Sequence, residues 1–258
     1  MRKATLVIIA IIVIAFGGLM FWSLSQKSEN SANYAEIDAN AIIGPSKYNG
    51  EIGDHVFGNA AAPVLIFEYA DYQCPGCATT YPRLKKLLDE YGDQLGIVYR
   101  SYLLSYHQNG TAAASAAEAA GLQGYWAEYA NLLFTNQSEW EYASVKERGT
   151  LFLKYFEAAS DAEGDLDKFQ ADMSSASVKK KVDFDMGLGK YIGVESTPWL
   201  VLEGEHIDIQ NAGGEDGFLK LMREKINAAL KKRGVEPKVE IKEDTASGGE
   251  SVTIDASF

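Results

Sequence analysis

The chain has 258 residues, of which 47% are hydrophobic, and it carries a formal net charge of −12 at pH 7. This length and apolar content allow one globular domain with an insertion, or two small domains, and supply ample material for a core. The acidic balance argues against a nucleic-acid-binding protein and against polybasic attachment to a membrane surface.

An apolar segment at the start of the chain predicts a membrane anchor. The basic tip at residues 1–3 precedes an uninterrupted apolar run over residues 4–22, about the length that a helix needs to cross a bilayer. Positive charge before the run predicts a cytoplasmic N-terminus with the bulk of the protein outside. We expect residues 1–24 to form a cytoplasmic tip and a single-pass transmembrane helix in the cell membrane, and residues 25–53 to form a polar linker. A cleaved signal peptide is the alternative, but the run is long for that role.

The only two cysteines of the chain, Cys74 and Cys77, lie at a predicted strand-to-helix junction. The apolar run at residues 64–67 favours a buried strand, and residues 78–91 place leucines on one face of a helix. Cys74 then falls near the helix N-cap, with Pro75 in the first turn, where its missing N–H costs nothing. The free N–H groups and the positive dipole end of the helix favour a thiolate there. One cysteine of such a pair can attack a substrate disulfide while the other resolves the mixed disulfide.

Other uses of a closely spaced cysteine pair are open. A tetrahedral zinc site needs four ligands, and the remaining candidates, His55, His107 and His206, are widely scattered and lack ligand spacing. A static disulfide across so small a loop would remove little entropy from the unfolded chain. The many carboxylates show no calcium-loop signature. We therefore expect redox chemistry with no metal and no cofactor, and we expect His107 to be a core residue.

The second half of the chain predicts helices, then a hairpin and a final helix. Residues 108–190 are rich in alanine and carry apolar side chains at helical spacing. A turn at residues 203–205 between two apolar runs predicts a hairpin. An amphipathic helix is expected over residues 213–233. Residues 234–258 alternate short apolar and charged pieces, so we expect a flexible tail.

Several stretches of the chain resemble the DsbA-like thioredoxin-fold proteins, especially the membrane-anchored thiol-disulfide oxidoreductases of bacteria. The resemblance is plain in residues 54–77 and covers roughly residues 54–233. Its further landmarks are Val98-Tyr99-Arg100, His107, Ala112 to Gly124, Trp126 and Gly193 to Pro198. It implies an α/β thioredoxin fold whose two parts, residues 54–107 and 191–233, enclose an inserted helical domain over residues 108–190.

The resemblance assigns roles around the cysteine pair. It implies that Cys74 and Cys77 are the catalytic dithiol, with Pro75-Gly76 as the active-site loop between them. Glu68 stands where this fold holds a buried acid beneath the second cysteine. A carboxyl group in an apolar setting has a raised pKa and can relay a proton, so we assign Glu68 as proton acceptor or donor for Cys77. The alternative is a glutamate at a strand edge that reaches solvent.

Residues 197–199 supply the predicted substrate contacts. By the resemblance Pro198 is a cis proline beside the cysteines, and Thr197 presents backbone groups to a substrate strand, a mode that binds peptides with little regard to sequence. Taken alone, a proline that opens a strand can be an edge feature and nothing more. Trp199 either walls the substrate groove or is a core tryptophan of the strand.

The expected function is that of an extracytoplasmic oxidase that donates its Cys74–Cys77 disulfide to exported proteins. We expect a monomer that is reoxidised by a membrane partner of the DsbB or VKOR kind. Export places the cysteines where disulfides persist. Strong oxidases of this family often have a histidine between the cysteines, and this chain has Pro75-Gly76, so a reductase or isomerase of the same fold is an alternative. A non-enzymatic peptide-binding or chaperone module is another.

Overall fold

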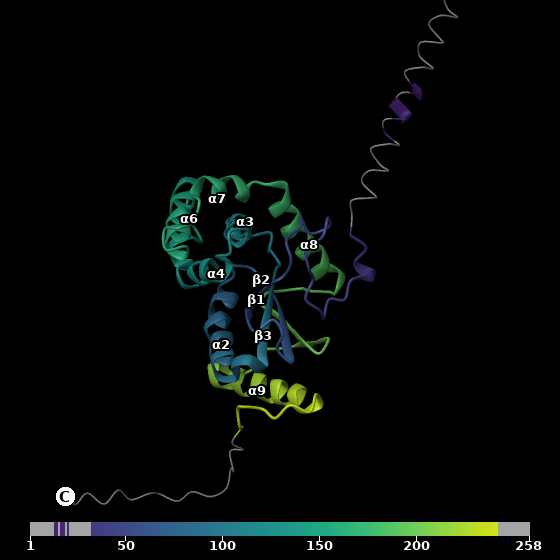
Figure 1. Cartoon of the computed structure of the whole chain (residues 1–258), viewed down its shortest axis with the longest axis vertical. Helices are drawn as coiled ribbons and strands as arrows, with labels where there is room; N and C mark the ends of the chain where they lie inside the picture. Colours follow the sequence, from purple (N-terminus) through teal and green to yellow (C-terminus); the bar gives the residue numbers. More distant parts are fainter. Residues whose placement is uncertain (1–12, 15, 19, 21–31, 242–258) are drawn as a thin grey trace, which may run out of the picture.

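A mixed β-sheet forms the centre of the protein (Figure 1). The structure is a computed structural model that describes residues 13, 14, 16–18, 20 and 32–241. Within these residues the strands lie in the order β1-β3-β2-β4-β5, with β2 and β3 parallel and the other neighbours antiparallel. Their bounds are β1 His55–Gly58, β2 Val64–Ala70, β3 Leu95–Ser101, β4 Trp199–Leu202 and β5 Glu205–Ile207.

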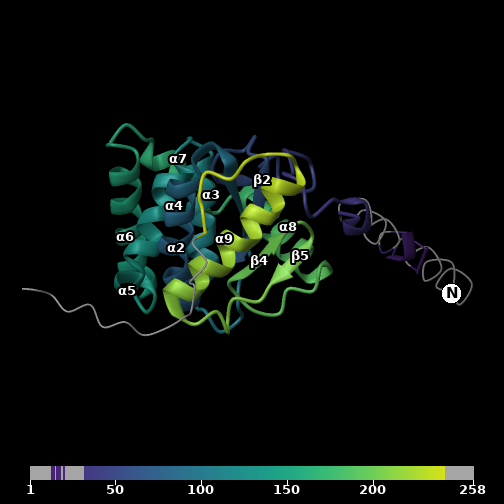
Figure 2. The same cartoon turned by 90° about the horizontal axis from the view of Figure 1, so that it is seen from below.

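Two helices cover one face of the sheet. α2 (Pro75–Tyr91) follows β2, and α9 (Gly214–Lys232) packs beside α2 and near β4 and β5 (Figure 2). Apolar residues recur at helical spacing in both helices, so each presents one buried stripe to the sheet. The core between the helices and the sheet includes Val64, Ile66, Leu84, Leu87, Leu95, Leu200, Phe218, Met222 and Ile226.

The segment between β3 and β4 folds into a helical domain beside the sheet, as Figure 1 shows. Its helices are α3 Gly110–Gly121, α4 Trp126–Thr135, α5 Gln137–Trp140, α6 Val145–Ala159, α7 Leu166–Met173 and α8 Ala176–Tyr191. Alanine fills most of the buried positions of α3, and such small side chains let the neighbouring helices approach closely. The predicted α/β architecture with a helical insertion is therefore confirmed.

Part of the predicted polar linker, residues 39–43, packs against the sheet face opposite α2. Tyr34, earlier in the same segment, packs on Phe184 and Tyr191 of α8. Arg100 of β3 is fully buried on that sheet face and donates hydrogen bonds to Ala39 O at 2.7 Å and to Ala41 O at 2.8 Å. Its Nη2 group also donates to the Asp54 carboxylate at 2.7 Å. A buried guanidinium group needs such partners, and their loss would leave an uncompensated charge. These contacts hold the segment on the sheet.

The two predicted terminal segments are described only in part. The anchor predicted for residues 1–24 falls mostly outside the described residues, as do residues 25–31 of the predicted linker and residues 242–258 of the predicted tail. Among the residues that are described, no helix combines the length and the apolar character needed to cross a membrane. The start of the tail is held against α9, because Asn227 Nδ2 donates to Val239 O at 2.8 Å.

Candidate active site

The two cysteines lie in the first turn of α2, where the chain passes from strand to helix. Cys74 is the N-cap residue and Pro75 is the first helical residue, as predicted. Both cysteines are free thiols in this structure. Cys74 is 7% exposed, whereas Cys77 lies one turn inside the helix and is fully buried. Cys74 is therefore the member of the pair that a protein substrate can reach.

The loop before β4 lies directly against Cys74. Its Thr197–Pro198 peptide bond is cis, as expected. The Cys74 thiol donates a hydrogen bond to the Thr197 carbonyl oxygen, 3.4 Å from the sulfur. A Cβ atom added at Gly76 would lie 3.2 Å from Pro198 Cδ and 3.6 Å from the Cys74 sulfur. The turn between the cysteines and the 197–198 loop can pack this closely because Gly76 has no side chain.

Hydrogen bonds to the sulfur lower the pKa of Cys74 to about 5, although burial acts in the opposite direction. The largest contribution comes from the Cys77 thiol, and the Thr197 side chain and the backbone N–H groups of Cys77 and Gly76 add to it. The buried Thr197 hydroxyl has no hydrogen-bond partner among the described residues while Cys74 is a thiol. It is thus available to donate when the thiolate forms. Cys74 is a nucleophile at neutral pH.

The pKa of Cys77 is shifted in the opposite direction to that of Cys74. Burial, its hydrogen bond to Cys74 and the nearby negative charges of Cys74 and Glu68 raise the pKa of Cys77 well above its ordinary value. A thiol, unlike a thiolate, is a poor nucleophile, so Cys77 needs a group that takes its proton before it can attack.

The charge of Glu68 on β2 acts on Cys77, so Glu68 is the candidate group to exchange that proton. It is 1% exposed, and its Oε1 atom has no hydrogen-bond partner among the described residues. Burial raises the pKa of the Glu68 carboxyl to about 8. The alternative of a glutamate that reaches solvent is therefore wrong. At neutral pH the carboxyl group is mostly protonated, so it can protonate a Cys77 thiolate. Its catalytic role stays a prediction, and its burial and pKa are what that role requires.

Trp199 lies on the other face of the sheet from the cysteines. Side chains alternate along β4, so Leu200 packs on the α2 side while Trp199 packs with Phe67 and Val201 on the opposite side. The Trp199 ring stacks on His206 with 3.5 Å between ring centroids. This position favours the core alternative, and a substrate contact of Trp199 stays an untested prediction.

Sequence reasoning missed Asp71, which shapes the active-site loop. Its buried carboxylate accepts hydrogen bonds from Gln73 N at 2.9 Å and from Leu104 N at 3.0 Å, and it lies 2.8 Å from His107 Nδ1. Its backbone carbonyl accepts from Cys74 N at 2.9 Å. His107 therefore helps to anchor this loop. The available signal was an aspartate directly after a buried strand and three residues before the first cysteine.

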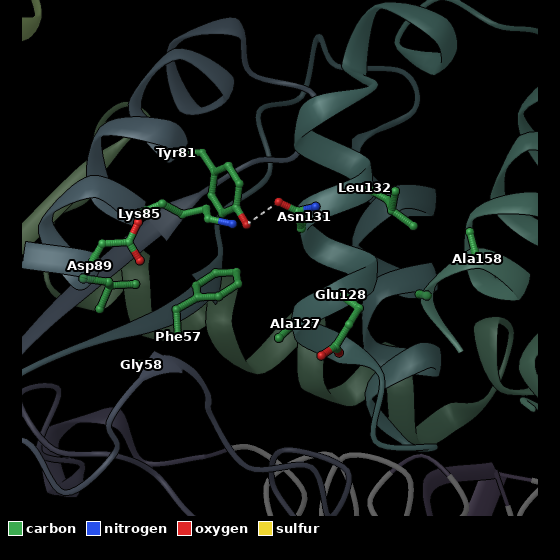
Figure 3. Close-up of a pocket in the computed structure, with 12 residues that line it drawn as sticks. Phe57, Gly58, Tyr81, Lys85, Asp89, Ala127, Glu128, Asn131, Leu132 and Ala158 are labelled. Atoms are coloured by element: carbon green, nitrogen blue, oxygen red, sulfur yellow. Dashed lines mark hydrogen bonds between the residues drawn. The ribbon is translucent and has the colours of Figure 1, made fainter. Parts of the chain in front are cut away.

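A hollow of about 470 Å³ lies between α2, α4 and β1 (Figure 3). Tyr81 and Asn131 point toward one another across it, and the Tyr81 hydroxyl donates to Asn131 Oδ1 at 3.1 Å. None of the residues that line the hollow is a predicted site residue. Among the described residues, no group of three or more His, Cys, Asp or Glu side chains is arranged to hold a metal ion.

Comparison with known proteins identifies the family. A family model described as thioredoxin matches residues 51–221. This chain belongs to the thioredoxin family. Oxidised BdbD from Bacillus subtilis is 20% identical, with 74% of this chain and 98% of BdbD covered and a TM-score of 0.57. The α-DsbA1 protein of Wolbachia pipientis is 20% identical, with 70% and 94% covered and a TM-score of 0.54. These similarities confirm the DsbA-like form of the thioredoxin fold.

The curated relatives of this thioredoxin-family chain are much longer proteins. A Na(+)/H(+) antiporter NhaA from Herminiimonas arsenicoxydans is 28% identical over 206 residues, which are 80% of this chain and 31% of the relative. NhaA 3 from Salinispora tropica is 31% identical over 151 residues, 58% of this chain and 22% of the relative. The chain thus spans less than a third of their length. Because 206 of its residues are aligned, the first match must include much of the thioredoxin segment.

The hydrogen bonds around Cys74 predict a thiolate in neutral solution. In the reduced thioredoxin-family protein, thiolate absorbance at 240 nm should titrate near pH 5, where the pKa of Cys74 lies. Thr197→Val should raise this pKa by about one unit, because one hydrogen bond to a charged group is lost. Thr79→Val is the matched control, since the Thr79 hydroxyl is exposed and bonds Pro75 O at 2.9 Å. A Thr197→Val titration identical to wild type would contradict this account.

The burial of Glu68 predicts a pH-dependent cost to stability. The pKa of its carboxyl is raised from 4.5 to about 8 by folding. The contribution of Glu68 to the free energy of unfolding is therefore fully present below about pH 4.5, where the carboxyl group is protonated in both states. This contribution is lost as the pH rises through about 8. In urea unfolding of the disulfide form, Glu68→Gln should gain stability over wild type between pH 5 and 8. Glu128→Gln, at an exposed glutamate, should not. A Glu68→Gln difference that is constant with pH would refute the shift.

Proposed function

We propose that this protein is an extracytoplasmic thiol-disulfide oxidase that introduces disulfides into exported proteins. The observation that carries the proposal is the asymmetry of the dithiol: the pKa of Cys74 is lowered to about 5 and that of Cys77 is raised. When the pKa of Cys74 lies below the ambient pH, its thiolate is stabilised and the reduced protein is favoured. The Cys74–Cys77 disulfide is then a stronger oxidant. Each ~1.4 kcal/mol of such preference corresponds to about 30 mV.

In the proposed reaction a client thiolate attacks the Cys74 sulfur of the enzyme disulfide. The Cys74–Cys77 bond breaks, and Cys77 leaves as a thiolate that takes a proton from Glu68. A second client thiolate then attacks the client sulfur of the mixed disulfide, and Cys74 leaves as a thiolate. Its low pKa makes it a good leaving group. The client is oxidised by two electrons and the enzyme ends as the dithiol.

The proposed setting is the outer side of the cell membrane, with residues 1–24 as the anchor. The basic tip and the apolar run of residues 4–22 support this orientation. A monomer tethered in this way would meet reduced, cysteine-containing exported proteins as clients. A membrane-embedded reoxidant of the DsbB or VKOR kind, coupled to quinone, would accept the two electrons and restore the disulfide.

A reductase or isomerase is the competing proposal, and Pro75-Gly76 is the feature that favours it. This turn offers no side-chain donor to the Cys74 thiolate, so Thr197, Cys77 and backbone N–H groups must supply all the stabilisation. A non-enzymatic peptide-binding module would need no thiolate at all, and it would keep full function in cells as a Cys74→Ser variant.

The reduction potential separates the two redox proposals. The full-length protein is equilibrated with glutathione buffers, and the dithiol fraction is measured by alkylation and mass. We expect a potential more oxidising than about −180 mV, because the thiolate stabilises the reduced form. A potential near that of thioredoxin, about −270 mV, would make the protein a reductase.

Trapping in cells tests the client proposal directly. Cys77→Ala leaves Cys74 able to form mixed disulfides that Cys77 cannot resolve, so these adducts should accumulate in the membrane fraction. They should disappear on reduction, and Cys74→Ala/Cys77→Ala should form none. Mass spectrometry should identify exported proteins, together with a membrane reoxidant, among the partners. An absence of adducts in Cys77→Ala cells would remove the support for catalysis.

A further inference from the structure

Three side chains form a row across the sheet at the level of Glu68. Tyr99 of β3 pairs with Glu68 on one side and with His55 of β1 on the other. Paired residues on neighbouring strands project from the same face, with Cβ atoms about 5 Å apart. This is the α2 face, because Tyr99 belongs to the same buried cluster as Cys77. The row thus leads from the buried acid to the edge strand of the sheet.

The outer end of the row is a hydrogen-bonded His–Glu pair that reaches solvent. His55 Nε2 lies 2.8 Å from Glu118 Oε2 of α3, and the His55 side chain is 16% exposed while that of Glu118 is 2% exposed. The His55 ring stacks on Trp126 of α4, with 4.6 Å between centroids and 6° between planes. Imidazole is the side chain that takes up and releases protons between pH 5 and 8. The contacts with Glu118 and Trp126 fix the position of the His55 ring.

Unpaired polar atoms lie along the same row. Glu68 Oε1, Tyr72 Oη and Trp126 Nε1 are buried and have no hydrogen-bond partner among the described residues. The Tyr72 ring stacks on Tyr99 at 4.8 Å, and the Tyr99 ring lies 5.6 Å from that of Trp126. Buried polar groups nearly always have a partner, and where protein supplies none an internal water does. The Tyr99 hydroxyl itself donates to Ala70 O at 3.2 Å, and an internal water beside it would join it to these three atoms.

We propose that this row carries protons between Glu68 and solvent, with the His55–Glu118 pair as its outlet. The inference rests on the proposed function, in which Glu68 must exchange its proton with solvent in every cycle. Because Glu68 is 1% exposed, it cannot exchange protons with bulk water directly. His55 and Tyr99 are relay residues: among the described residues neither makes a hydrogen bond to Cys74 or Cys77, and they act through Glu68.

The proton balance of each half-reaction requires this exchange. When the enzyme disulfide is opened, Cys77 leaves as a thiolate and takes the Glu68 proton, and the row brings a proton from solvent to the carboxylate. In the reverse step Glu68 first releases its proton outward along the row, because its carboxyl group is mostly protonated at neutral pH. The resulting carboxylate takes the Cys77 proton as Cys77 attacks the Cys74 sulfur of a mixed disulfide. The leaving thiolate is protonated by solvent, and Glu68 ends as the neutral acid.

The groups that face the two ends of the row define its electrostatics. Titratable groups near Glu68 are Cys77 and Tyr81 of α2, Tyr72 of the loop and Tyr99 of β3. Those near Glu118 are His55 of β1, Tyr72 of the loop, and Lys181 and Asp185 of α8. Tyr81 offers the competing outlet, because its hydroxyl opens onto the hollow of Figure 3.

The test isolates the step in which Cys77 resolves a mixed disulfide. Reduced full-length protein is mixed with saturating oxidised glutathione at pH 5 to 8 and quenched with acid, and mass spectrometry follows the Cys74–glutathione adduct. His55→Gln and Tyr99→Phe should slow the decay of the adduct by at least about tenfold, which is below the roughly 100-fold or more that a positioned proton-transfer group contributes, and should alter its pH profile. Its formation rate should stay as in wild type. Added imidazole should restore the rate in His55→Ala.

Matched variants separate a relay from a structural role. His206→Gln removes a tryptophan-stacked histidine from the opposite edge strand, and Tyr81→Phe removes the competing outlet; both should decay as wild type. A relay changes rates and leaves the reduction potential unchanged, whereas a structural role would shift it. Unchanged decay in His55→Gln and Tyr99→Phe, or slowing by Tyr81→Phe in their place, would overturn the proposal. Because glutathione is the probe, this result is independent of the clients and of the measured potential.

Discussion

The burial of an unpaired carboxyl group beneath the cysteines is the constraint on which the site depends. Among the described residues a charged Glu68 would have no counter-ion, so burial raises its pKa to about 8 and favours the neutral acid. A neutral acid leaves Cys77 protonated, and the Cys77 thiol is then the largest single donor that lowers the pKa of Cys74. The reactive thiolate is thus stabilised by a hydrogen bond, with no cation among the groups that lower its pKa.

The helical domain contributes to this arrangement from outside the sheet. Gln137 of α5 donates to Tyr72 O at 2.7 Å and to Cys74 O at 3.1 Å, which fixes the loop that leads into α2. Glu118 of α3 meets His55 at the sheet edge. A domain that only covered the active site would not need buried polar groups at these positions. The insertion therefore positions both the nucleophile and the outer end of the proposed proton row.

Local patterns predicted the parts of the site that depend on neighbours in the chain. The N-cap position of Cys74 follows from a strand, a proline and a helix in sequence, and the burial of Glu68 follows from its apolar strand. The contacts of residues 39–41 could not be predicted in this way, because they depend on Arg100, a buried cation on a distant strand. The row from Glu68 through Tyr99 to His55 depends on strand order, which sets β1 beside β3. No periodicity within one segment contains that information.

The turn between the cysteines shows how packing restricts the chemistry open to this chain. A Cβ atom at position 76 would be 3.2 Å from Pro198 Cδ, closer than most real contacts of that kind, so a larger residue there would displace the 197–198 loop. That loop carries Thr197, whose side chain helps to lower the pKa of Cys74. A donor added between the cysteines would therefore disturb a donor already present. With glycine at this position, the thiolate depends on Thr197, Cys77 and backbone N–H groups, and its stability is set by how firmly the fold holds them.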